Sequence, residues 1–174
     1  NKLVGNITIA ASKTISNYIM PNIYFDFLTK YKDVKLDILT INSSKIIDKI
    51  LKSEIDIGLI EIDTQNSSLI KEKLCDDELI VVTSDKNYKK EAFIDAIKKR
   101  WILREIGSGT REIFINYIGD ISKELDIFMQ LQDFEEIKTI VLNNPDTVTT
   151  LSKVIVKKEL EENKLFQIKL KNIN

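Results

Sequence analysis

Apolar and polar positions along the chain follow two spacings, which predict strands and helices in turn. Period-two or continuous apolar runs indicate strands, and apolar residues three or four positions apart indicate one face of a helix. The predicted strands cover residues 6–11, 35–40, 55–60, 78–83, 101–105, 128–131, 147–151 and 165–168. Six helices are predicted: the first begins at residue 13 or 21, the second follows Asn42, and the third covers residues 89–100. The fourth follows residue 111, the fifth covers residues 134–141, and the sixth ends at residue 160. This alternation is typical of an α/β fold in which helices cover a parallel sheet.

The strand–helix pattern restarts after residue 83, which predicts two small lobes. If the last strand or helix returns to the first lobe, the chain crosses between lobes near Thr83-Ser84 and again near Ser152-Lys153. A double crossover makes a hinge, and the crevice between such lobes lies at the carboxyl ends of the strands. The pattern therefore predicts a ligand-binding crevice.

Composition favours a packed, water-soluble domain that does not itself bind nucleic acid. Hydrophobic residues make up 43% of the 174 residues and charged ones 30%. Lys and Arg number 26 against 27 Asp and Glu, which gives a net charge of −1 and no cationic excess for phosphate contacts. No apolar run approaches the roughly 18 residues of a membrane span. We therefore expect no membrane contact and a cytoplasmic location.

The side-chain inventory argues against catalysis and metal binding. The chain has no His, which excludes Ser-His-Asp and Cys-His catalysis and any His-bearing zinc site. Cys75 is the single cysteine, so it forms neither an internal disulfide nor a multi-cysteine metal site. Its acidic neighbours Asp76, Asp77 and Glu78 disfavour a reactive thiolate. We expect no enzyme activity, no metal and no cofactor.

The most informative turn lies between a predicted strand and a predicted helix, at residues 107–111 (GSGTR). Glycines expose backbone N–H groups, and a helix N-terminus adds partial positive charge, so Ser108, Gly109 and Thr110 could hold an oxyanion that Arg111 neutralises. Glu112 replaces the third glycine of a dinucleotide-binding motif, and the Gly-Lys-Ser/Thr of a P-loop is missing. The alternative is an ordinary turn with Thr110 as N-cap.

A second polar turn, Ser12-Lys13-Thr14, occupies the equivalent place in the first lobe. Its hydroxyls could cap the helix or bind a ligand, since both uses need the same unpaired N–H groups. Two such turns, one from each lobe, would face each other across the crevice.

Three further residues are candidates at this crevice. Asn42 follows the second strand, and either caps a helix or reaches the ligand. Glu61 ends the third strand, and either meets an amino group on a ligand or is solvated. Thr147 follows a turn at residues 143–146 (NNPD) and could face the crevice.

Four segments resemble the effector-binding domain of LysR-type transcriptional regulators. These are residues 5–12 (GNITIAAS), 14–21 (TISNYIMP), 55–61 (IDIGLIE) and, most specifically, 104–111 (REIGSGTR). They occur in the family's order and extend along essentially the whole chain. The family often has a Gly-rich turn where this chain has NNPD, and Lys13 brings a cation to the mouth of the crevice.

The resemblance implies a type 2 periplasmic-binding-protein-like fold, with two α/β lobes joined by a double-crossover hinge. By that similarity the first lobe is residues 1–83 plus 158–174, and the second is residues 84–157. A small, anionic effector in the interlobe cleft would rearrange a homodimer, or a tetramer in the full-length protein, and thereby control transcription. DNA would be contacted only through a helix-turn-helix domain, which this chain lacks.

Two alternatives share the fold. An exported, monomeric solute-binding protein for a small anion would use the same crevice, and the upstream coding sequence separates it from a regulator. An enzyme on this fold needs a nucleophile–base pair, for which the chain offers no candidate.

Overall fold

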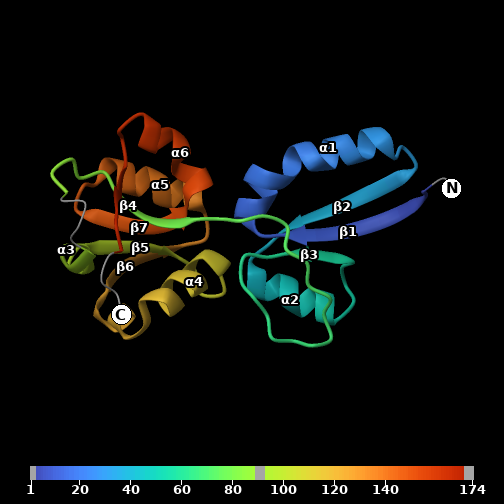
Figure 1. Ribbon diagram of the computed structural model, residues 1–174, viewed down its shortest axis with the longest axis horizontal. Coiled ribbons are helices and arrows are strands. Elements are labelled where there is room, and N and C mark those ends of the chain that lie inside the picture. Colours follow the sequence, from blue (N-terminus) through green and yellow to red (C-terminus); the bar gives the residue numbers. More distant parts are fainter. Residues whose placement is uncertain (1–2, 89–92, 171–174) are drawn as a thin grey trace. The chain divides into compact units, whose positions relative to one another are not determined.

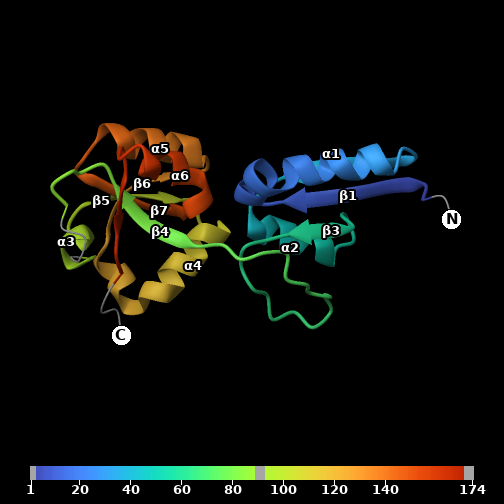
Figure 2. The same cartoon turned by 45° about the horizontal axis from the view of Figure 1, so that its top comes forward.

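The computed structural model describes residues 3–88 and 93–170 and divides the chain into two compact units (Figures 1 and 2). The first unit contains residues 1–74 and 107–109, and the second contains residues 75–106 and 110–174. Each unit has its own sheet and its own hydrophobic clusters.

The first unit is built on a parallel sheet of three strands in the order β2-β1-β3. These strands are β1 (Gly5–Ala11), β2 (Val34–Thr40) and β3 (Ile57–Leu59). The last residue of β1, Ala11, lies opposite Thr40 of β2 and Leu59 of β3. All three strands therefore reach their carboxyl ends at the same edge of the sheet.

Helices cover both faces of this sheet (Figure 1). They are the π-helical turn η1 (Ile15–Ile19), α1 (Met20–Lys30) and α2 (Ser43–Leu51). Neighbouring residues of β1 point to opposite faces. Ala10 accordingly packs with Ile46 of α2, whereas Ala11 packs with Ile15 and Met20 of the first helix.

The first helix runs without a break from residue 13 to Lys30. The π turn comes directly before Pro21, whose ring would otherwise contact the carbonyl four residues earlier and which has no N–H to donate. Both predicted helix starts, at residues 13 and 21, therefore belong to one helical segment.

The second unit is built on a five-stranded mixed sheet in the order β6-β5-β7-β4-β8. The strands are β4 (Leu79–Thr83), β5 (Arg100–Arg104), β6 (Asp126–Leu131), β7 (Thr147–Ser152) and β8 (Phe166–Ile168). β5 runs parallel to β6 and β7, whereas β4 runs antiparallel to β7 and β8. The helical elements are α3 (Phe93–Ile97), α4 (Gly109–Ile118), the 3₁₀ turn η2 (Gly119–Glu124), α5 (Phe134–Asn143) and α6 (Lys153–Glu161).

Helices cover both faces of the second sheet, with α5 and α6 on one side and α3 and α4 on the other (Figures 1 and 2). The strand residues alternate between the two layers. Ile80 and Val82 pack with Phe134 of α5, while Val81 between them belongs to the cluster around Trp101. The Trp101 ring stacks on Phe114 with 5.2 Å between ring centroids. Two apolar layers thus hold this unit together.

The predicted element order is confirmed, with small differences at the ends. The third strand is shorter than expected, at residues 57–59. Leu51, the last residue of α2, is 44% exposed, and Tyr117 on α4 is 61% exposed, so neither is a core residue. The predicted helix over residues 89–100 corresponds to α3, which begins at Phe93; residues 89–92 lie outside the described residues, and Arg100 already belongs to β5.

The division into units differs from the predicted lobe boundaries of 1–83 plus 158–174 and 84–157. Strand β8 pairs with β4, and Leu165 packs in the same cluster as Phe134. The residues around β8 therefore belong to the second unit, because their hydrogen bonds and apolar contacts are made there.

An ion pair fastens the loop after β4 to the turn before β7. Lys99 Nζ donates to Asp85 Oδ2 at 2.8 Å and to the Pro145 carbonyl at 2.8 Å, and both charged side chains are less than a third exposed. The hydrogen bond from Lys99, aided by one from the Asn87 N–H, holds the pKa of Asp85 below its ordinary value. Because the folded-state pKa is lowered, this pair stabilises the fold above the unfolded pKa, and the contribution is lost as pH falls through the folded value.

Asp85→Asn should lower the free energy of unfolding at pH 7 by about 1 kcal/mol, the upper end for a partly exposed pair. The difference from wild type should shrink as the pH falls below about 4, the ordinary pKa of Asp, and should vanish as the pH falls through the lowered pKa of Asp85 in the folded protein. Urea unfolding followed by Trp101 fluorescence between pH 3 and 7 measures it. Asp120→Asn, which breaks an exposed pair with Lys123, is the control and should cost less. A pH-independent difference would contradict the ionic origin of the effect.

Candidate functional site

Polar residues follow all three strands of the first sheet at its carboxyl edge. Ser12 comes directly after β1, Asn42 lies two residues beyond β2, and Glu61 lies two residues beyond β3. The register of the strands makes them neighbours, since Ala11 lies opposite both Thr40 and Leu59. Backbone hydrogen bonds continue the pairing past the strand ends, from the Ser12 N–H to the Leu59 carbonyl and from the Ile41 N–H to the Ala11 carbonyl.

The Gly107-Ser108-Gly109 turn packs directly on this edge and belongs to the first unit. The Ser44 N–H donates to the Gly107 carbonyl at 3.4 Å. A Cβ atom on Gly109 would lie 2.8 Å from Ser43 Oγ and 2.9 Å from Glu61 Oε2, so the backbone there lies against both side chains. The turn predicted from its glycines is thus in contact with the residues that follow β2 and β3.

Gly107 is required at its position for two reasons. Its φ of +87° lies in the left-handed region that favours glycine, and a Cβ atom would lie 2.5 Å from Ser44 Oγ. A side chain there would both strain the backbone and push the turn off the start of α2.

We call seven of these residues the strand-end cluster: Ser12, Thr14, Asn42, Ser43, Glu61, Ser108 and Gly109. Six of them are predicted from the sequence, and Ser43 is the addition. Ser43 carries the same signal that identified Ser12, a hydroxyl just after a strand and at the start of a helix. A hydroxyl in that position is also a good N-cap, so the sequence alone does not tell which of the adjacent residues Asn42 and Ser43 caps the helix.

Asn42 has the capping role that the sequence left open. Its side-chain Oδ1 accepts from the Lys45 N–H at 3.1 Å and from the Ser44 hydroxyl at 3.0 Å, which satisfies the first turn of α2. Ser12 has a similar role, because its Oγ accepts from the Ile15 N–H at 3.4 Å. These two side chains stabilise helix starts at the edge of the cluster, and each uses at least one of its acceptor sites to do so.

Three hydroxyls of the strand-end cluster are buried and have no hydrogen-bond partner among the described residues. They belong to Thr14, Ser43 and Ser108, which are 1%, 0% and 1% exposed. Burying an unpaired hydroxyl costs about 1–3 kcal/mol, and most buried polar side chains are therefore paired. Three such groups in one cluster are an arrangement that a bound polar molecule would satisfy.

The same three hydroxyls stand at the beginnings of three helices. Thr14 is the residue before η1 and makes no capping bond, Ser43 is the first residue of α2, and Ser108 directly precedes α4. Helix N-termini carry partial positive charge and unpaired N–H groups, so they favour anions. Glu61, half-buried beside Gly109, adds a carboxylate that would accept hydrogen bonds from a donor group. The cluster therefore offers donors for an anionic group and an acceptor for a second group.

Lys13 lies between Ser12 and Thr14 and is partly exposed. It is the first residue of the first helix, so its backbone lies at the border of the cluster. A contact of its ammonium group with a ligand stays a prediction.

The remaining predicted site residues belong to the second unit and have roles there. Arg111 Nη1 donates to the Arg104 carbonyl at 2.9 Å and to Gln130 Oε1 at 2.7 Å, so this guanidinium links α4 to two strands. The Thr147 hydroxyl donates to the Asn144 carbonyl at 2.7 Å and thus closes the turn before β7. Thr110, the second residue of α4, is 1% exposed. A ligand contact of Thr110, Arg111 or Thr147 stays a prediction.

Within residues 3–88 and 93–170, no group of three or more acidic, cysteine or histidine side chains could hold a metal ion. Cys75 is exposed. None of the described helices combines the length and the apolar character needed to cross a bilayer.

Removing an unpaired hydroxyl should not destabilise the free protein. Ser43→Ala, Ser108→Ala and Thr14→Val are expected to leave the free energy of unfolding unchanged or to raise it by up to about 1 kcal/mol, because each deletes a buried group without a partner. Ser12→Ala is the matched control in the same unit. It should cost about 1 kcal/mol, because the Ile15 N–H loses its acceptor. Urea unfolding followed by circular dichroism measures these differences, and equal losses in all four variants would show that the hydroxyls are paired.

A sequence model described as the LysR substrate binding domain matches residues 1–173. An HTH-type transcriptional regulator of Escherichia coli strain K12, YeiE, is 30% identical over 167 residues, which cover 94% of this chain and 57% of the relative. The chain thus spans little more than half the length of such relatives.

Solved structures show the same fold. The effector-binding domain of QuiR in complex with shikimate superposes with a TM-score of 0.80 at 16% identity, over 99% of this chain and 83% of that one. A phosphate ABC transporter substrate-binding protein from Clostridium perfringens, with bound phosphate, superposes with a TM-score of 0.78 at 21% identity, over 98% and 77%. The predicted α/β, type 2 periplasmic-binding-protein-like fold is confirmed.

Proposed function

Because the chain belongs to the LysR substrate-binding domain family, we propose that it senses a small anionic metabolite through its strand-end cluster. The observation that carries the proposal is the set of buried hydroxyls of Thr14, Ser43 and Ser108, which have no partner among the described residues. Each sits at a helix start, where an anionic group is favoured electrostatically. The hydroxyls would donate to that group and thereby recover the hydrogen bonds that they lack.

The ligand class follows from the mixture of groups in the cluster. A bare oxyanion would use the three hydroxyls but would be repelled by the carboxylate of Glu61. A ligand that carries a hydroxyl or amino group as well as an anionic group would bind to both parts of the cluster. Its anionic group would accept from the three hydroxyls, and its hydroxyl or amino group would donate to Glu61. We therefore propose a hydroxy acid or an amino-bearing acid as the effector. Shikimate, the ligand in the QuiR complex, is a hydroxy acid.

Binding would control transcription in the longer protein by mass action. An effector that prefers one arrangement of the domain shifts the population toward it, and a coupling free energy of about 1–3 kcal/mol is typical. The relative YeiE is an HTH-type transcriptional regulator, which supports coupling to a DNA-binding domain. We propose that the readout is a rearranged homodimer, or a tetramer in the full-length protein, in the cytoplasm, without catalysis.

The alternative of an exported solute-binding protein is less well supported. The phosphate-binding neighbour shares the fold at 21% identity, whereas the family model covers residues 1–173 and the regulator YeiE reaches 30%. A shared fold at low identity does not carry function. We therefore retain the regulatory function as the proposal.

Ser43→Ala and Ser108→Ala should each weaken effector binding by roughly tenfold, because a hydrogen bond to a charged group contributes about 1.5–3 kcal/mol. A thermal-shift screen of sulfate, phosphate, shikimate and other small hydroxy acids finds the ligand, and calorimetry then gives its affinity. Ser122→Ala is the control, because its hydroxyl is exposed and bonded to the Gly119 carbonyl. Unchanged affinity in both cluster variants would contradict the proposed site.

Glu61→Gln distinguishes the binding contribution of the ligand's anionic group from that of its hydroxyl or amino group. It removes a negative charge, so sulfate affinity should rise several-fold, by about 1 kcal/mol. Affinity for an amino-bearing or hydroxy acid should fall, because the amide accepts a weaker hydrogen bond than the carboxylate does. Calorimetry with one ligand of each kind measures both changes, and a shift in the same direction for both ligands would show that Glu61 contacts neither group as proposed.

A further inference from the structure

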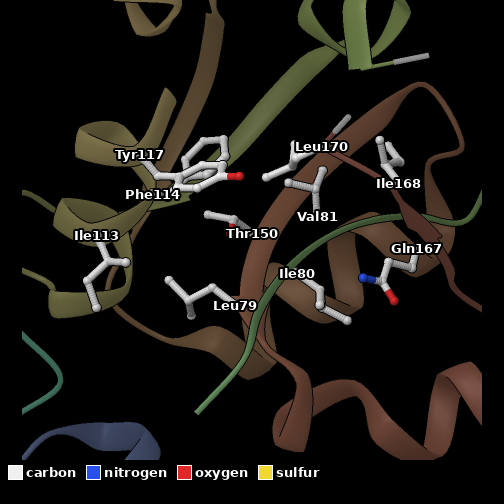
Figure 3. Close-up of a pocket in the computed structure, with 10 residues that line it drawn as sticks. All are labelled: Leu79, Ile80, Val81, Ile113, Phe114, Tyr117, Thr150, Gln167, Ile168 and Leu170. Atoms are coloured by element: carbon white, nitrogen blue, oxygen red, sulfur yellow. The ribbon is translucent and has the colours of Figure 1, made fainter. Parts of the chain in front are cut away.

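The second unit contains a cavity of about 330 Å³ beside α4, separate from the strand-end cluster (Figure 3). Its lining comes from α4, from strands β4, β7 and β8, and from the segment after β8. The lining residues are Leu79, Ile80, Val81, Ile113, Phe114, Tyr117, Thr150, Gln167, Ile168 and Leu170. Small-molecule sites in proteins begin at about 300 Å³, so the cavity has the size of a small-ligand site.

The lining is apolar, with three uncharged polar groups. Seven of its ten side chains are hydrocarbon, and the polar groups come from Tyr117, Thr150 and Gln167. None of these ten residues is charged, so an ionised guest would lose its hydration without gaining a counter-charge. Figure 3 shows the Tyr117 hydroxyl pointing across the cavity toward the strand residues. The chemistry therefore fits a neutral ligand with a large apolar part.

Thr150 supplies the second observation that points to a ligand. It is 2% exposed, and its Oγ1 has no hydrogen-bond partner in the described part of the chain. On β7 it lies opposite Val81 and two residues beyond Val148, so its side chain faces the layer of α3 and α4. Valine would fill this position without an unpaired hydroxyl, so the threonine costs free energy unless something bonds to it.

We propose that this cavity is a second small-molecule site, which binds a neutral phenol or a similar aromatic alcohol. The ring of the ligand would lie against Phe114 and Tyr117, where aromatic side chains favour stacked or edge-to-face contacts. Its hydroxyl would exchange a hydrogen bond with Thr150 Oγ1, and Gln167 would bound the opposite side. The site is independent of the proposed effector site, because all its residues belong to the second unit and none belongs to the strand-end cluster.

The test uses two probes of nearly equal shape, p-cresol and p-xylene, which differ by a hydroxyl in place of a methyl group. In an amide NMR titration of the whole chain, p-cresol should shift signals of α4, β7 and β8 and bind more tightly than p-xylene. Thr150→Val should weaken p-cresol binding by roughly fivefold and leave p-xylene binding unchanged, since only the hydroxyl is lost. Retained p-xylene binding also shows that this variant is folded and keeps its cavity.

Ile113→Trp fills the cavity and should abolish binding of both probes, whereas Ser108→Ala should affect neither. The proposal is overturned if p-cresol produces no shifts in the wild-type protein, or shifts that lie elsewhere. It is also overturned if Thr150→Val binds p-cresol as the wild type does. Failure of the effector proposal would appear instead as unchanged anion binding in Ser108→Ala, so the two results are distinguishable.

Discussion

The function proposed here depends on the unsatisfied hydrogen-bonding capacity of three buried hydroxyls, those of Thr14, Ser43 and Ser108. A folded protein normally pairs such groups, because a buried donor without an acceptor opposes folding. The parallel register of β1, β2 and β3 ends all three strands at one edge, where helices begin after β1 and β2, and the Gly107–Gly109 turn brings Ser108 against the same edge. The unpaired hydroxyls lower the stability of the ligand-free protein, and a ligand that accepts their hydrogen bonds would raise it again.

The neighbouring residues keep the hydroxyls available. Asn42 satisfies the first turn of α2, and Ser12 accepts from the Ile15 N–H, so these helix starts do not depend on the three hydroxyls. Gly107 holds the turn at a φ of +87°, which lets the backbone approach Ser44. Because other residues cap α2 and the first helix and Gly107 supplies the turn geometry, these hydroxyls can bind a ligand without loss of the local structure.

Much of this architecture could be predicted from the sequence, and the rest depends on contacts between residues that are distant in the sequence. Apolar spacing gave the order of strands and helices, and the polar turns at residues 12–14 and 107–111 gave two pieces of the cluster. The hydrogen bond from Arg111 to Gln130 depends on a tertiary contact that no spacing encodes, whereas the one from Thr147 to the Asn144 carbonyl closes a local turn. A ligand contact of either residue stays a prediction. The assignment of residues 158–174 to the first lobe differs from the contacts for the same reason, since the partners of β8 are distant in sequence.

The most direct measurement is a crystal structure of the domain grown in sulfate, followed by one with the effector that the thermal-shift screen identifies. We expect an anionic group with oxygens within hydrogen-bond distance of the hydroxyls of Thr14, Ser43 and Ser108. We also expect that a hydroxyl or amino group of the effector donates to Glu61. Electron density in which ordered water satisfies all three hydroxyls while the anion binds elsewhere would contradict the proposed site.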